Sequence, residues 1–134
     1  MRRKNDTNES GQALVEFALV APVLFLILFA IIQFGVAFMH SVALTDAVRA
    51  GARKAAVSRT AADPSAAATS AVVGAAADLD SSTLQNGVSV TPGASGWVAG
   101  GTVTVSAQYP YQIDILGIVV ASGYLHSTTT ERLE

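Results

Sequence analysis

The feature that most constrains the fold of this chain is an uncharged apolar run near its start. From Phe17 to Met39 there are 23 residues without a charge, and Gln33 is the one strongly polar residue among them. As a helix this run is roughly 34 Å long at ~1.5 Å per residue, whereas the hydrocarbon core of a bilayer is about 30 Å thick. A cleaved secretory signal is the competing interpretation, but its apolar region usually spans only ~7–15 residues. The longer run, entered directly at Glu16, favours a membrane-spanning helix.

Composition excludes several classes of protein. The chain has 134 residues, of which 51% are hydrophobic and 13% charged, so it is too apolar for intrinsic disorder and has the length of one domain at most. A net charge of -2 argues against a nucleic-acid partner. Because there is no cysteine, disulfides, thiol nucleophiles and Cys-ligated metal sites are excluded.

The helix is predicted to continue beyond the apolar run, from residue 40 to residue 59, because that stretch has no proline and is rich in Ala, Leu, Val and Arg. Small residues recur every four positions on one face, at Ala43, Ala47, Gly51 and Ala55. Such a ridge allows a second backbone to approach closely. An ordinary alanine-rich helix whose composition reflects only helix propensity explains the same pattern equally well.

A second, shorter helix is predicted after the break at residues 60–64. Asp63 before Pro64 is typical of an N-cap followed by a first-turn proline. We expect this helix to reach about Asp78, with Asp78 and Asp80 capping and terminating it. Asn86–Gly87 then indicates a turn.

The rest of the chain has the alternation of β-strands. Val88–Thr91, Thr102–Tyr109 and Tyr124–Leu133 are the predicted strands, and Pro110 is expected to end the second of them. Ile113–Ala121 is apolar but too short to cross a membrane a second time. The predicted fold class is therefore α+β: a transmembrane helix that continues into a long extracytoplasmic helix, then a small helix and an antiparallel sheet.

No constellation for catalysis emerges from the sequence. His40 and His126 are separated by a helix and most of a small domain, which argues against a metal pair or a catalytic triad. There is no Gly-rich phosphate loop, no nucleophile elbow and no His-Glu-x-x-His motif. We expect no enzyme activity, no metal or other cofactor and no small-molecule substrate.

One constellation stands out, where the polar leader meets the apolar run. Residues 10–17 read Ser-Gly-Gln-Ala-Leu-Val-Glu-Phe, followed by an apolar segment broken by a single proline. This pattern resembles the class III signal of type IV pilins and pseudopilins, and most closely the TadE-like branch of the Flp/Tad pilus proteins. Residues 47–53, Ala-Val-Arg-Ala-Gly-Ala-Arg, resemble the stretch that follows the membrane helix in that family. The close resemblance covers residues 10–59, and the remainder is similar in outline only, which fits a pseudopilin-like fold.

The resemblance implies a cleavage site and an assembly residue. A prepilin peptidase would cut between Gly11 and Gln12, where a slim residue suits a peptidase cleft. Glu16 and Phe17 would serve recognition and assembly, and the Glu16 carboxylate would neutralise the N-terminal amine of a neighbouring subunit. A carboxylate near hydrocarbon is costly and marks a functional site by default. In the competing interpretation, Glu16 merely occupies the headgroup region in the first helical turn.

Orientation has weaker support than the span itself. Three Lys or Arg residues precede the apolar run and four follow it, at positions 2–4 and 49–59, so the positive-inside rule does not discriminate. Residues 1–11 are too short and polar to fold and form the expected cytoplasmic leader. Residues 12–59 form the transmembrane and extended helix, and residues 60–134 a small module outside the cytoplasmic membrane.

The resemblance therefore implies a structural minor pseudopilin in Flp/Tad pilus biogenesis, located in the cytoplasmic membrane or associated with the pilus. Its expected partners are the prepilin peptidase, other pilins or pseudopilins, the inner-membrane assembly platform and the lipid bilayer. The alternative is an unprocessed, membrane-anchored adhesion or scaffold module that uses the span only as an anchor.

Overall fold

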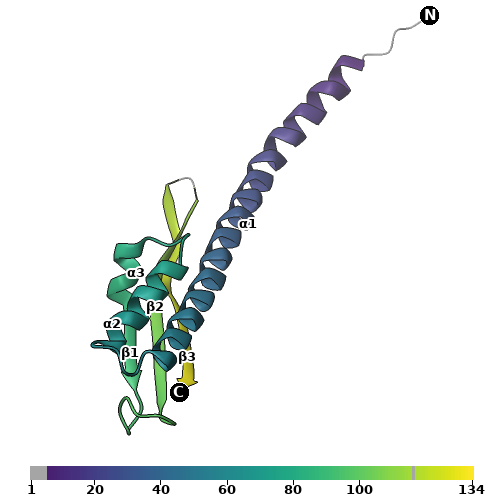
Figure 1. Ribbon diagram of the computed structural model, residues 1–134. Helices are drawn as coiled ribbons and strands as arrows, with labels where there is room; N and C mark the ends of the chain where they lie inside the picture. The colour runs from purple at the N-terminus through teal and green to yellow at the C-terminus, as the bar shows by residue number, and fades with distance from the viewer. Residues whose placement is uncertain (1–5, 116) are drawn as a thin grey trace, which may run out of the picture.

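The computed structural model describes residues 6–115 and 117–134, with side chains from residue 11 onward. A single long helix carries a small mixed module at its C-terminal end (Figure 1). The elements in chain order are α1 (Asp6–Val57), α2 (Pro64–Ala75), α3 (Ser81–Gly87), β1 (Val88–Pro92), β2 (Thr102–Ile115) and β3 (Ile118–Arg132). The predicted α+β class is confirmed.

The first half of α1 projects away from the rest of the molecule (Figure 1). Helix α1 runs unbroken through Pro22, and consecutive apolar side chains such as Leu24, Phe25 and Leu26 are 44–61% exposed. From Phe17 to Ile32 apolar residues surround the helix on all sides, so this stretch has no water-facing stripe of the kind that a surface helix shows. It is long and apolar enough to cross a membrane, and only 6% of its most apolar window is buried within the chain.

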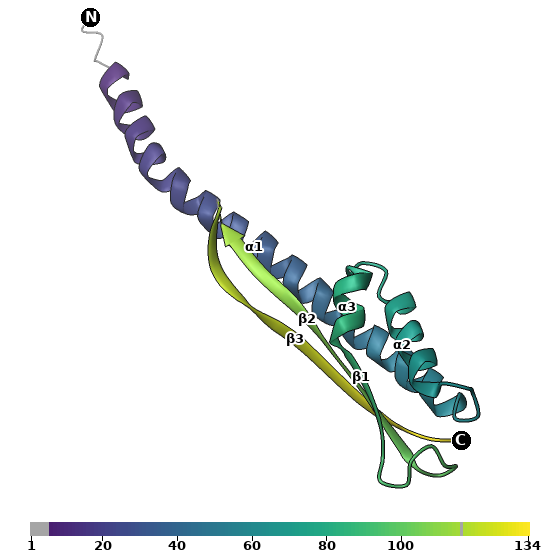
Figure 2. The ribbon, with the colours of Figure 1, turned by 90° about the vertical axis from the view of Figure 1, so that its left-hand side faces the viewer.

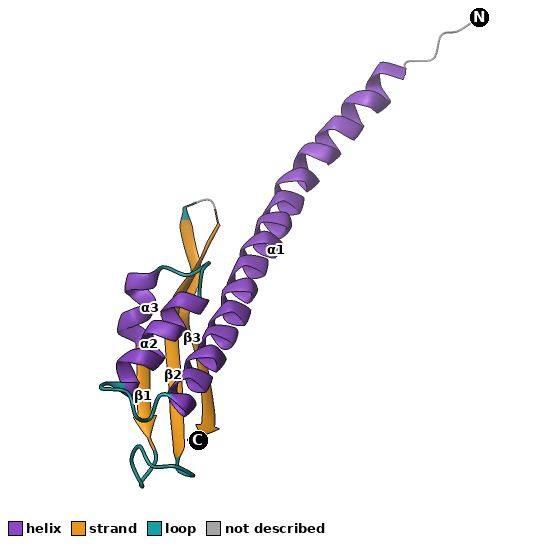
Figure 3. Ribbon diagram, in the orientation of Figure 1, coloured by secondary structure: helices purple, strands orange, loops and turns teal. Residues whose placement is uncertain are grey.

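The three strands form one antiparallel sheet in the order β1-β2-β3. The helices lie on one side of this sheet (Figures 2 and 3). The alternation of β2 explains this arrangement, because Val103, Val105 and Ala107 are buried while Thr102 and Gln108 on the other face are exposed. Helix α1 contributes Leu44, Val48 and Ala52 to the same core, α2 contributes Ala68 and Val72, α3 contributes Leu84, and the C-terminal segment contributes Leu133.

The region between α1 and the sheet differs in part from prediction. Asp63 caps α2 as expected, since its carboxylate accepts a hydrogen bond from the Ala66 amide at 2.9 Å. The helix ends at Ala75 instead of near Asp78, and Asp80 does not terminate it. Asp80 is the N-cap of a third helix, α3, and that helix includes the Asn86–Gly87 pair that the sequence assigns to a turn.

The prediction that Pro110 ends the central strand is wrong, because β2 continues to Ile115. Strand β1 pairs with β2 only between Val103 and Ala107, so β2 has an open edge from Gln108 onward. A proline is tolerated at such an edge because its missing N–H costs no ladder hydrogen bond on the open side. The longer strands build a β2–β3 hairpin that extends alongside α1 (Figure 2).

The C-terminal segment is attached to the end of α1. The Glu134 amide donates to the Ala56 carbonyl at 3.2 Å, and the Arg59 guanidinium donates to the Glu134 carbonyl. Leu133 is buried and exchanges backbone hydrogen bonds of 2.8 Å with Gly100 and Gly101. The module and the second half of α1 therefore share one packed core.

Candidate assembly site

The Gly11–Phe17 segment lies in the first part of α1, in a fully helical and exposed conformation. Nothing lies within 4 Å of where a Cβ at Gly11 would stand. Glycine lowers the stability of a helix by roughly 0.5–1 kcal/mol relative to alanine, so local unwinding is easier at this residue than at its neighbours. A peptidase that needs an extended substrate would find both access and a weak point here.

Glu16 lies one turn beyond the predicted cleavage point. Its carboxylate accepts a hydrogen bond of 3.1 Å from the side-chain amide of Gln12, and both residues are exposed. Among the side chains that the structure describes, no cationic group pairs with Glu16. Phe17, the next residue, is 65% exposed and begins the uncharged run. The exposed Glu16 carboxylate thus lies at the start of the apolar part of α1, where a partner can reach it.

The ridge of small residues lies at the other end of α1, inside the module. Ala47, Gly51 and Ala55 are buried, and Ala43 is half-buried. At Gly51 a Cβ would collide with the Val72 Cγ2 methyl of α2 and would stand 3.1 Å from the Ala68 carbonyl oxygen. The second backbone that approaches this ridge is therefore α2 of the same chain.

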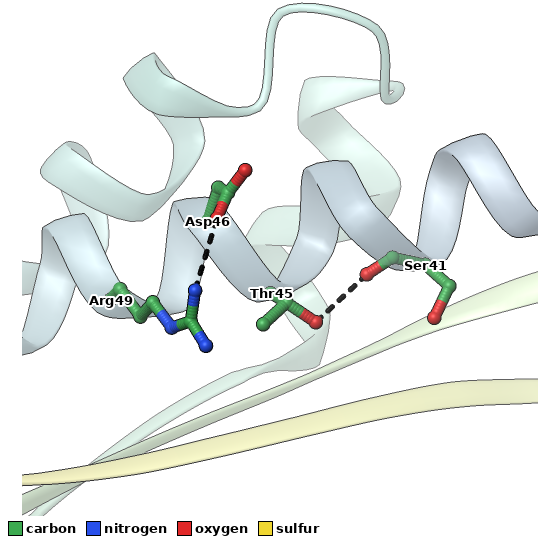
Figure 4. Close-up of polar contacts among 4 residues, drawn as sticks. All are labelled: Ser41, Thr45, Asp46 and Arg49. Atoms are coloured by element: carbon green, nitrogen blue, oxygen red, sulfur yellow. Dashed lines mark hydrogen bonds and ion pairs between the residues drawn. The ribbon is translucent and has the colours of Figure 1, made fainter.

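The charged residues of α1 occupy its solvent-facing side in the module. Asp46, Arg49 and Arg53 are all exposed, and the Arg49 guanidinium lies 3.5 Å from the Asp46 carboxylate (Figure 4). Both side chains are more than half exposed, so this pair contributes little to stability. Thr45 donates from its hydroxyl to the Ser41 carbonyl at 2.9 Å, a bond within the helix (Figure 4).

The two histidines lie on different elements and do not meet. His40 on α1 contacts Tyr109 edge-on with 5.9 Å between ring centroids, and His126 on β3 lies 6.4 Å from the Tyr124 ring. In the part of the chain that the structure describes, no group of three His, Asp or Glu side chains is arranged to hold a metal ion.

One contact within the apolar run was not predicted from the sequence. The side-chain amide of Gln33 donates a hydrogen bond of 2.9 Å to the backbone carbonyl of Asp114, at the end of β2. The signal was present, because Gln33 is the only strongly polar residue between Phe17 and Met39. Nothing in a single sequence, however, identifies a backbone carbonyl 81 residues away as its partner.

The Gly11–Phe17 segment also lies within a match to a known protein family. Residues 11–53 match the model of the TadE-like protein family. The match begins at the predicted cleavage glycine, includes Glu16 and the apolar run, and ends within the part of α1 that packs in the module. No curated protein and no solved structure matches the chain.

The TadE-like match indicates a role in Flp/Tad pilus assembly, in a family whose members are generally structural. Such a role implies interaction with other pilus components. The single apolar helix Gly11–Val57 indicates a single-pass membrane protein, as far as the described residues are concerned.

Proposed function

We propose that this protein is a minor pseudopilin of Flp/Tad pilus biogenesis, structural and not catalytic. The observation that carries the proposal is the coincidence of two features: the TadE-like match starts at Gly11, and Glu16 stands exposed at the entrance of an apolar helix that is bare on all sides. A bare apolar helix suits lipid before assembly and the helices of other subunits afterwards.

In this proposal the chain is divided as its sequence suggests. A prepilin peptidase removes residues 1–11 on the cytoplasmic side, and Gln12 becomes the new N-terminus. Residues 12–59 supply the span and the long helix, and residues 60–134 the module outside. The inner-membrane assembly platform and other pilin subunits are the partners.

Glu16 acts in this scheme by charge. Once Gln12 is the N-terminus, the Glu16 carboxylate lies one helical turn from a free α-amine. The existing Gln12–Glu16 hydrogen bond, 3.1 Å long, supports the idea that this spacing brings the two residues together. The N-terminal α-amine of a neighbouring subunit can pair with the Glu16 carboxylate in the same way. Such a pairing stabilises an ionised carboxylate near hydrocarbon.

Determining the mature N-terminus tests the proposal. Mass spectrometry of the chain purified from membranes should give Gln12 as the first residue. A Gly11→Trp variant should accumulate as a precursor heavier by residues 1–11, because a bulky side chain obstructs the peptidase cleft. The fold should tolerate it, since the position is open.

Gly35→Trp is the matched control, because Gly35 is equally open and lies on the same helix, away from the cut. It should be processed normally. Normal processing of Gly11→Trp, or an intact Met1 in the wild type, would refute the pseudopilin proposal. An intact Met1 would favour the membrane-anchored adhesion or scaffold module.

A further inference from the structure

The tip of the β2–β3 hairpin is apolar and exposed, unlike the rest of the exposed sheet. Ile118, Val119 and Val120 are 68%, 49% and 56% exposed. The register shifts here: Ile113 pairs with Ala121 and Asp114 with Val119, which leaves Val120 as an extra residue. A bulge of this kind redirects side chains. Three consecutive aliphatic side chains facing outward require an explanation other than alternation.

The tip lies beside the apolar run of α1. The Gln33 amide donates to the Asp114 carbonyl at 2.9 Å, which fixes the end of the hairpin at the level of Gln33. Figure 2 shows the hairpin reaching this far along α1. If the hydrocarbon begins at Phe17, a core of about 30 Å ends roughly 20 residues later, near Val36. The contact therefore falls about one helical turn inside that boundary.

Aromatic residues follow the tip along the hairpin, in the direction of the rest of the sheet. Tyr111 and Tyr124 share with Phe34 and Phe38 the wall of a groove of about 400 Å³ between α1 and the hairpin. Tyrosine is enriched where hydrocarbon meets water, because its ring is apolar and its hydroxyl polar. The order along the hairpin is thus aliphatic tip, tyrosine band, and then the Ser- and Thr-rich sheet.

Polar groups near the tip limit how deep it reaches. The Asp114 carboxylate accepts a hydrogen bond of 2.8 Å from the Gly117 amide, so it satisfies a turn donor that lipid could not. A carboxylate is costly in the middle of a bilayer but tolerated at its interface. The Gln33 amide is likewise satisfied by a backbone carbonyl rather than left bare. Both arrangements suit the outer part of a leaflet.

We propose that the Ile118–Val120 tip inserts into the lipid leaflet on the module's side of the membrane and forms a second membrane contact beside α1. Lipid is the partner of this surface, because the exposed aliphatic side chains of the tip lie next to the apolar span of α1, at the level of Gln33. The contact holds the module against the bilayer in one orientation about α1. It does not depend on cleavage at Gly11 or on which side the module faces.

Single-cysteine labelling of the full chain tests this inference directly, because the natural sequence has no cysteine. Val119→Cys places an environment-sensitive fluorophore on the tip, Leu24→Cys places it in the span and Thr128→Cys places it on the exposed face of β3. The labelled chains are reconstituted in phosphatidylcholine vesicles with a small fraction of lipid carrying a nitroxide quencher near the headgroup end of its acyl chain.

The label at position 119 should be quenched several-fold more than the one at position 128 and should emit at shorter wavelength. Quenching at position 24 establishes that α1 is inserted. If the label at 119 behaves like the one at 128 while that at 24 is quenched, the tip is in water and the proposal is wrong. A third outcome is a blue-shifted emission at position 119 that the lipid quencher does not reduce and that returns to longer wavelength when the protein is diluted in lipid. That outcome would show that the tip binds a second copy of the chain, and the proposal would be wrong.

Discussion

At the scale of single residues, a substitution at Glu16 can remove the charge of the side chain without changing its shape. Glu16→Gln keeps the size of the side chain and its capacity to accept from Gln12, but removes the charge. A charge-assisted hydrogen bond is roughly twice as strong as a neutral one, so docking against a neighbour's amine should weaken. We expect normal insertion and cleavage after Gly11, with loss of pilus assembly or of co-purifying pilins.

Two readouts on one sample keep this prediction distinct from a folding defect. The mature mass reports processing, and the co-purifying subunits report assembly. Wild-type piliation in a strain carrying only Glu16→Gln would show that the carboxylate is an interfacial residue without a role in assembly.

Gly51 is the residue at which the packing of α1 against α2 is tightest. Gly51→Leu would force a side chain into the space of Val72 and toward the Ala68 carbonyl. Overpacking of this kind typically costs 1–3 kcal/mol, so we expect the free energy of unfolding to fall by at least about 1–3 kcal/mol. Urea unfolding in detergent, followed by the fluorescence of Trp97, measures it, because Trp97 packs against the core.

Gly74→Leu is the matched control for Gly51→Leu. Gly74 also lies in a helix, but nothing stands within 4 Å of its Cβ position, and the residue is exposed. Leucine is the better helix former, so stability should stay the same or rise by about 0.5–1 kcal/mol. Equal loss in both variants would mean that Gly51 is not a special packing position.

At the scale of elements, α3 shows what local sequence patterns fail to define. Asn86–Gly87 is a common turn pair, yet it forms the last turn of a seven-residue helix. Only Leu84 in that helix is buried, so there is no periodic apolar pattern from which to predict it. The signal that was available is Asp80, which accepts from the Thr83 amide at 2.8 Å as an N-cap.

The Asp80 cap makes a pH prediction. Hydrogen bonds from the Ser82 hydroxyl and then from the Thr83 amide lower the pKa of Asp80 from 3.8 to about 2. A carboxyl whose pKa is lowered by folding contributes stability that is complete above its unfolded pKa and is lost as pH falls toward the folded one. This contribution should therefore disappear between about pH 4 and pH 2.

Asp80→Asn isolates that contribution from those of the other carboxylates. Asparagine caps a helix about as well as aspartate but does not titrate. In unfolding midpoints measured from pH 6 to pH 2, the wild type should become less stable relative to the variant as the pH falls below about 4. A constant difference across the whole range would contradict the assignment of Asp80 as an ionised cap.

The strands were predictable where alternation is clean and not where it stops. Val103, Val105 and Ala107 share the buried face as their spacing predicts. Pro110 was expected to end β2, because a proline interrupts a strand that is paired on both sides. Here β1 is short and pairs with β2 no further than Ala107, so no strand lies beside Pro110 on that edge. The rules for single residues do not contain that information.

At the scale of the whole molecule, the sequence defines the long apolar helix and the order of the elements, but not how they dock. The placement of the β2–β3 hairpin along α1 rests on contacts between residues far apart in the chain, such as the Gln33–Asp114 hydrogen bond. Such contacts have no local signature. Half of α1 is left bare, while the other half supplies part of the module's core.

This division of α1 underlies the last prediction, which concerns topology. The buried core of the module includes α1 from Leu44 onward, so the module must lie on one side of any membrane that the first half of α1 crosses. We expect that side to be outside the cytoplasmic membrane, because the polar leader is too short to fold and would be processed in the cytoplasm. A reporter enzyme active only outside, fused after Glu134 through a flexible linker, should be active.

The linker is needed because the backbone of Glu134 is hydrogen-bonded to Ala56 and Arg59, although its side chain is exposed. A second reporter that is active only in the cytoplasm, fused at the same point, should be silent. If the two results are exchanged while both fusions are stable, the module lies inside, and residues 1–11 then lie on the side opposite to a cytoplasmic peptidase. Processing at Gly11 and the Glu16 pairing would fail together in that case, whereas insertion of the hairpin tip into the leaflet on the module's side would be unaffected.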